Sequence, residues 1–148
     1  MAHSVQREAH TATRLRWPFL GRPQVLLVIA ALVTIVASFL PWLDTALGSS
    51  SGVMAGGLLT FYAGLLAFPG VMWRNRRVVA GHIFLLAAAD IAVPGWRFLW
   101  ALRRLPGLGE AWLPGPGMLL VVISGVVATV ALVQLLTATR AASGSPGA

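Results

Sequence analysis

The chain has 148 residues, 57% of them hydrophobic and 10% charged, whereas a soluble domain carries about 25% charged residues, so an ordinary soluble enzyme is excluded. Intrinsic disorder is also excluded, because disordered chains are poor in apolar residues, and an integral membrane protein remains. A net charge of +7 is typical of proteins that bind nucleic acid. Here, however, the arginines flank apolar runs, where they set membrane topology. We therefore expect no nucleic-acid partner.

The first part of the chain pairs a basic head with two apolar runs. Residues 1–22 hold four arginines and one glutamate, and we expect this head on the cytoplasmic side of a membrane. The first apolar run covers about 25–43. A serine and glycine loop at 48–52 separates it from the second run, at about 53–73. Both runs predict spanning helices, because about 20 apolar residues cross the hydrocarbon core of a bilayer.

A basic turn leads to two further apolar runs. The third begins at about residue 78 and is interrupted by Pro94 before it is long enough to span. We expect it to continue through a kink, which gives a helix over 78–100. A connection rich in Pro, Gly and Trp follows, and the fourth run covers 118–137. The small, polar residues 141–148 predict a disordered tail.

These runs predict one domain over residues 23–140, an all-α membrane protein with four transmembrane helices in an antiparallel bundle. Strands are not expected, because the runs are long and lack the polar–apolar alternation of a membrane barrel. In lipid the backbone must satisfy its own hydrogen bonds, which favours helices.

The arginines predict the orientation of the bundle, because short cytoplasmic loops carry an excess of positive charge. With both termini inside, most of the arginines face the cytoplasm, so we expect an N-in, C-in protein. The inner set is then Arg7, Arg14, Arg16, Arg22, Arg74, Arg76, Arg77 and Arg140, and the outer set is Arg97, Arg103 and Arg104.

Asp90 is the only acidic residue within a predicted span, and it marks the principal candidate site. A charge at the bilayer centre costs about 2.5–3.5 kcal/mol on insertion scales, so an intramembrane acid is a functional candidate. Pro94 follows four residues later and cannot donate a hydrogen bond to the carbonyl of Asp90. The other helices place polar side chains at comparable depth, and these are expected to cluster with Asp90: Ser38, Thr60, Tyr62 and Ser124.

Two interpretations of Asp90 stay open. In one, Asp90 is a protonatable site for moving a proton or cation or for binding a polar headgroup. In the other it is a buried acid, neutral or paired with Arg97, that fixes helix packing. His82 lies about 12 Å away along the same helix. Gln134 is its expected hydrogen-bond partner, and we expect His82 to serve packing rather than proton transfer.

The end of the third span predicts contact with lipid headgroups. Residues 97–105 place Phe98 and three leucines on one helix face and Arg97, Arg103 and Arg104 on the other. Such an amphipathic segment is suited to the outer interface, with its arginines on lipid phosphates. The alternative is a helix end whose arginines extend toward water.

No catalytic or metal-binding signature accompanies these features. Residues 48–52 fit the letters GxSxG, but that motif has meaning only on the strand-to-helix elbow of an α/β sheet. His3 and His10 lack a third ligand, and cysteine is absent, so the case for a metal is weak. We therefore expect no catalytic residue, no metal and no cofactor.

Small residues supply candidate contacts between helices, because they let backbones approach closely where lipid offers no hydrophobic drive for association. Gly52 and Gly56 form a GxxxG pair, Gly57 and Gly64 extend that glycine face, and Gly125 serves the fourth span. These faces meet either within one chain or between chains.

Several of these residues also carry a resemblance. The stretch 38–42, the serine and glycine loop after it, the glycines Gly56, Gly57 and Gly64, and the basic turn together resemble the small four-span membrane proteins common in actinobacteria. The resemblance covers roughly residues 25–77. It implies a four-span bundle in a bacterial plasma membrane, and it brings no activity and no functional residues.

Three functions fit these observations. The first is a non-catalytic accessory or structural subunit, which contacts the lipid bilayer and another membrane protein or a second copy of itself. The second is an oligomeric transporter or channel subunit that uses Asp90. The third is a lipid-modifying enzyme that holds phosphate with the outer arginines. It ranks last because no acid, base and nucleophile cluster in the sequence.

Overall fold

The computed structural model describes residues 21–46, 48–73, 75–104 and 112–143. Over these residues the protein is mostly helical, with four helices that form the bundle and three short strands. In order the elements are α1 (Arg22–Ala37), β1 (Pro41–Thr45), β2 (Gly48–Ser51), the π-helical turn η1 (Val53–Gly57), α2 (Leu58–Met72), α3 (Arg76–Arg104), β3 (Trp112–Pro114) and α4 (Pro116–Ser143). The predicted head up to residue 20 and the tail from residue 144 lie outside the described residues.

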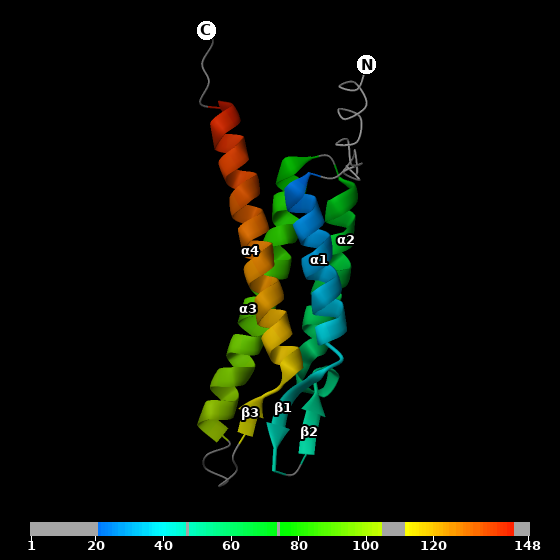
Figure 1. The fold of residues 1–148 in the computed structure, drawn as a ribbon, viewed down its shortest axis with the longest axis vertical. Coiled ribbons are helices and arrows are strands. Elements are labelled where there is room, and N and C mark those ends of the chain that lie inside the picture. Colours follow the sequence, from blue (N-terminus) through cyan, green and yellow to red (C-terminus); the bar gives the residue numbers. More distant parts are fainter. Residues whose placement is uncertain (1–20, 47, 74, 105–111, 144–148) are drawn as a thin grey trace, which may run out of the picture.

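The four helices run antiparallel to their chain neighbours and form a bundle (Figure 1). α1 packs against α2 and α4, α3 packs against the same two helices, and α1 and α3 lie diagonally with little direct contact. The start of α1, the turn from α2 to α3 and the end of α4 lie at one end of the bundle. The strands lie at the other end, which we call the sheet end.

Three segments are long and apolar enough to cross a membrane: Val53–Met72, Arg76–Arg104 and Pro116–Ala138. Their most apolar windows have mean hydropathies of 1.5, 1.8 and 2.6. The fourth helix, α1, is shorter, with 16 residues. At 1.5 Å per residue it rises about 24 Å, which is less than the roughly 30 Å hydrocarbon core. The structure therefore has three candidate spans and one shorter apolar helix.

The predicted extension of the first helix to residue 43 is wrong. α1 ends at Ala37, because Pro41 lacks an amide hydrogen and disfavours helical geometry in the residue before it. The chain then continues as β1 toward the sheet end (Figure 1) and buries Trp42 completely. The indole Nε1 of Trp42 donates to the carbonyl of Ala37 at 3.0 Å. Trp42 is thus a core residue at the end of α1.

Contrary to the expectation of helices alone, three short strands form a sheet in the order β2-β1-β3. β1 and β2 are antiparallel, with Thr45 opposite Gly48, so the predicted loop at 48–52 is largely an edge strand. β3 pairs antiparallel with the other side of β1, with Thr45 opposite Trp112. The connection before the fourth span therefore returns to the turn that follows α1.

The other helix boundaries also differ from the predictions. α3 continues through Pro94 as expected, but it is longer at both ends than 78–100. α4 likewise extends beyond 118–137. The second run is broken at Gly56, whose φ of 99° separates η1 from α2. Glycine adopts this left-handed conformation at little steric cost, so the break follows from the residue type.

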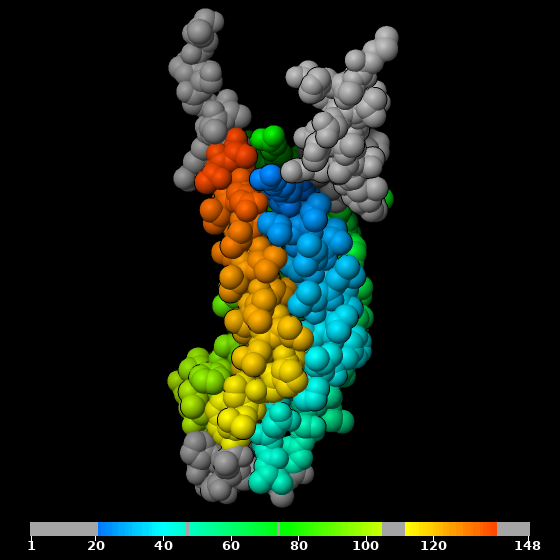
Figure 2. Space-filling model, viewed as in Figure 1, coloured from blue at the N-terminus to red at the C-terminus, as the bar shows by residue number. Residues whose placement is uncertain are grey.

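The outward faces of the helices are apolar. Small and aliphatic side chains such as Ala31, Ile83 and Leu86 fill the interior, while large apolar side chains remain exposed on every helix. Figure 2 shows α1 and α4 packed side by side along this surface. An apolar surface of this extent is the kind that lipid or a partner protein covers. The exposed set includes Ile29, Leu32, Leu59, Leu66, Phe84, Leu85, Ile123 and Val126.

Candidate functional site

A layer of polar side chains crosses the interior of the bundle and joins all four helices. Each is at most 1% exposed, although the surrounding core is apolar. We call this set the polar layer; it consists of Thr34 on α1, Ser38 directly after α1, Thr60 on α2, Asp90 on α3 and Ser124 on α4.

Asp90 lies at the centre of the polar layer. The hydroxyl oxygen of Thr34 lies 2.5 Å from Asp90 Oδ2 and 2.7 Å from the hydroxyl oxygen of Ser124. Ser124 in turn donates to the carbonyl of Ala30 at 2.8 Å. Asp90 Oδ1 is buried and has no hydrogen-bond partner among the described residues. One carboxyl oxygen is therefore held by α1, and the other faces the packed interior.

The second half of the polar layer joins α1 to α2. Ser38 donates to the carbonyl of Thr34 at 2.7 Å, and its hydroxyl lies 2.8 Å from that of Thr60. Thr60 donates to the carbonyl of Gly57 at 2.9 Å, next to the break between η1 and α2. Each hydroxyl thus donates to a backbone carbonyl, one in the last turn of α1 and one at the start of α2.

Local sequence places these groups together. Ser38 directly follows α1 with a helical backbone conformation and is four residues after Thr34, so its side chain continues the helix face that carries Thr34. Asp90 is the central residue of α3. A methyl group at Gly125 would lie 3.0 Å from Asp90 Cβ, so the missing side chain lets α4 lie directly against the acid. The small residue predicted for helix contact is thus used at the site itself.

The structure brings together Asp90, Ser38, Thr60 and Ser124, as expected from their depth. Tyr62 is not part of the cluster, and its side chain is 57% exposed beside Phe61. Two residues after Thr60 correspond to about 200° around the helix, which places Tyr62 on the opposite face. Thr34 was not predicted to belong to the cluster. Its position four residues before Ser38 was the sequence signal that could have placed it there.

Of the two states left open for a buried Asp90, neutral or paired with Arg97, the described residues do not show the pair. Seven residues separate Arg97 from Asp90 by about 10.5 Å along the axis, and Thr34 takes Asp90 Oδ2 instead. Arg97 lies beside Gly56, where a methyl group would come 3.2 Å from Arg97 Nε. Its guanidinium therefore extends toward the sheet end, in the way that long basic side chains reach the edge of a membrane.

His82 and Gln134 are not joined by a hydrogen bond among the described residues, so this predicted pairing is wrong. His82 Nδ1 lies 2.8 Å from the carbonyl of Val78 on its own helix. A methyl group at Gly70 would fall 2.6 Å from His82 Cβ, so α2 and α3 are in close contact here. Gln134 is exposed on α4. These positions favour a packing role for His82.

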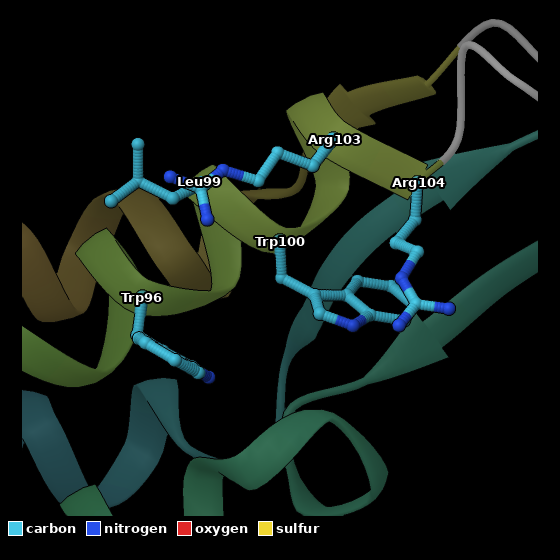
Figure 3. A pocket seen from close by; sticks show the side chains of 5 residues that line it. All are labelled: Trp96, Leu99, Trp100, Arg103 and Arg104. Atoms are coloured by element: carbon cyan, nitrogen blue, oxygen red, sulfur yellow. The ribbon is translucent and has the colours of Figure 1, made fainter.

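A second candidate site lies on the last turns of α3 (Figure 3). A surface pocket of about 310 Å³ is lined there by Trp96, Leu99, Trp100, Arg103 and Arg104. We call it the arginine–tryptophan pocket. It contains two of the three arginines predicted to contact lipid headgroups, and the third, Arg97, lines the neighbouring cavity.

No protein-family model, curated protein or solved structure matches the chain. Within the described residues, no group of three or more His, Asp or Glu side chains is placed to hold a metal ion. A role for either candidate site therefore depends on the geometry of the chain itself.

Proposed function

We propose that this chain is a small polytopic protein of a bacterial plasma membrane, and that it acts without catalysis as an accessory or structural subunit. Its partner is another membrane protein or a second copy of the chain. The polar layer is the observation that carries this proposal. Its five side chains bond to one another or to backbone carbonyls and are shielded from solvent, so they serve packing inside the bundle.

The proposed topology has four crossings with both termini cytoplasmic. It is supported by the antiparallel arrangement, in which the start of α1 and the end of α4 lie at the same end (Figure 1). Arg76 and Arg77 lie at that end too, in agreement with an excess of positive charge inside. The short helix α1 can still cross, because local thinning of the bilayer accommodates a short apolar segment at modest cost.

The alternative, a transporter or channel subunit that uses Asp90, has less support. A proton or ion path needs groups that reach water on both sides, whereas Asp90 is 0% exposed and packed against Thr34 and Gly125. His82 bonds to its own helix and does not continue a path. Proton and cation flux in proteoliposomes should therefore be the same for the parent and for Asp90→Asn. A flux that the substitution abolishes would establish the transporter instead.

Photo-crosslinking in the native membrane tests the contact function directly. A photoreactive benzoylphenylalanine is placed singly at exposed positions on three helices: Leu66 on α2, Phe84 on α3 and Ile123 on α4. We expect one face to give a discrete protein adduct of fixed mass while the other faces react with lipid alone. Protein adducts from none of the three positions, together with a monomer by native mass spectrometry in nanodiscs, would contradict the proposal.

A further inference from the structure

The sheet end concentrates arginine and tryptophan on one surface of α3. Trp96 and Trp100 line both the arginine–tryptophan pocket and a neighbouring cavity of about 650 Å³ that also contains Arg97 and Gly56. The two indoles are therefore shared by the two pockets. Arg103 and Arg104 extend to different sides of Trp100 (Figure 3), and Arg97, seven residues before Arg104, lies on nearly the same helix face as Arg104. Gly56 has a positive φ and no side chain, which leaves room for the Arg97 guanidinium.

The positive charge of this surface is not compensated within the described residues. The acids described are Asp44 on β1 and Asp90 in the polar layer, and neither forms an ion pair with an arginine. Arg103 and Arg104 are exposed in the last turn of α3. Three guanidinium groups are thus available to an external anion.

The surface also lies at the level of a membrane boundary. Open sheet edges do not occur in the hydrocarbon region, so the sheet at this end belongs to the headgroup or water side. Phe98 on α3 packs edge-to-face on Trp112 of β3, which fixes the end of α3 beside the sheet. Exposed tryptophans such as Trp96, at 70%, are typical of the interface between lipid and water.

We propose that the arginine–tryptophan pocket binds the phosphate of an anionic phospholipid. A single guanidinium binds phosphate oxygens through two parallel hydrogen bonds. Arg103 and Arg104 both line the pocket, on different sides of Trp100 (Figure 3), so each offers such a group. The indoles of Trp96 and Trp100, with Leu99, contact the glycerol and the first methylene groups of the lipid. The inference goes beyond the proposed contact function and requires only that the chain lies in a bilayer.

α3 itself provides a matched control for the test. Arg76 and Arg77 form a second pair of exposed, consecutive arginines at the opposite end of the same helix. Arg76 lines a pocket of about 340 Å³ whose lining contains no aromatic side chain. Both pairs carry the same charge, so a difference between them reports the pocket rather than the charge.

The experiment is a titration of the delipidated protein with phosphatidylglycerol, followed by native mass spectrometry. We expect R103Q/R104Q to weaken binding about tenfold, while R76Q/R77Q changes it less than about twofold. Trp100→Leu keeps both arginines and should also weaken binding. Unfolding temperatures of all variants are measured, and a variant that unfolds early is replaced by R103K/R104K, which keeps the charge but loses paired hydrogen bonds.

Two further titrations identify the source of the phosphate. Phosphatidylcholine, which has no net charge, should bind more weakly than phosphatidylglycerol, and glycerol phosphate without acyl chains should bind more weakly still. Equal losses from the two arginine pairs, or equal binding of glycerol phosphate, would overturn the proposal. The photo-crosslinks to a protein partner are measured separately, so failure here leaves the contact function unaffected.

Discussion

Thr34 and Asp90 join two helices that hardly touch elsewhere. The Thr34 hydroxyl lies 2.5 Å from Asp90 Oδ2, although α1 and α3 are diagonal in the bundle. The same hydroxyl oxygen is 2.7 Å from that of Ser124 on α4. One threonine therefore ties three helices together at the buried centre.

The number of hydroxyl protons in the contacts from Ala30 to Asp90 indicates whether the Asp90 carboxyl is protonated. Ser124 must donate to the carbonyl of Ala30, since a carbonyl only accepts. In the contact between Thr34 and Ser124, Thr34 must then donate its only hydroxyl proton. The contact between Thr34 and Asp90 needs a further proton, which neither hydroxyl can supply. A neutral carboxylic acid supplies it and leaves no net charge on the partnerless Oδ1. Neutral Asp90 is thus the form in which each contact from Ala30 to Asp90 has a proton.

Two substitutions of Asp90 should show whether its carboxyl is neutral, because one keeps a hydrogen-bond donor at this position and the other removes it. Asp90→Asn replaces the donating hydroxyl with a donating amide of the same shape, and we expect the free energy of unfolding to change by less than about 0.5 kcal/mol. Asp90→Ala removes the donor and leaves a cavity, which should cost about 1–2 kcal/mol. Equilibrium unfolding in mixed micelles measures both. An Asn variant as unstable as the Ala variant would contradict the neutral form.

Thr34→Val should lower the free energy of unfolding, although the two side chains have the same shape. The substitution keeps the shape but removes the hydroxyl that binds Asp90 and Ser124, so we expect a loss of about 1–2 kcal/mol. Thr137→Val is the control, because its exposed hydroxyl bonds only to carbonyls of its own helix. The same unfolding assay should place the control within about 0.5 kcal/mol of the parent.

Much of the polar layer could be predicted from the sequence by depth alone. The position of Asp90 within an apolar run sets its depth, and the same count on other runs finds Ser38, Thr60 and Ser124. Thr34 was treated as an interruption of an apolar run, because hydropathy does not record which helix face a residue occupies. The alternative in which Arg97 pairs with Asp90 stayed open for a similar reason, because a shared helix face and a long side chain do not decide between Arg97 and a closer hydroxyl.

The sheet could not be predicted, because its cause is tertiary. β2 has the sequence Gly48–Ser51, and glycine and serine have little strand preference. The pairing instead follows from burial of Trp42, with Gly52 and Gly117 packed so closely that a methyl group on either would clash with the indole. Of the GxxxG pair, Gly52 therefore packs against one tryptophan while Gly56 lies beside Arg97, and a pattern search cannot distinguish these uses from a helix contact.

The stability cost of replacing a glycine with alanine should depend on how closely a neighbouring helix packs against that glycine. A methyl group at Gly64 would lie 2.9 Å from Ile35 Cγ1, and one at Gly70 would lie 2.6 Å from His82 Cβ. Gly64→Ala and Gly70→Ala should therefore each cost about 1–3 kcal/mol. Nothing lies within 4 Å of the corresponding position at Gly81. Gly81→Ala should be neutral or should stabilise α3 by up to about 1 kcal/mol, and equal losses at all three sites would rule out this reading of the contacts.

The absence of cysteine makes the proposed topology directly measurable. Ser49 lies exposed on β2 at the sheet end, and Asn75 lies exposed in the turn between α2 and α3 at the other end. With both termini inside, Ser49→Cys should react with a membrane-impermeant maleimide in intact cells, because β2 is then outside. Asn75→Cys should react only after the membrane is permeabilised, since the arginines beside it hold that turn on the cytoplasmic side. The opposite labelling pattern would invert the topology, and labelling of both positions in intact cells would place the two ends of the bundle on one side.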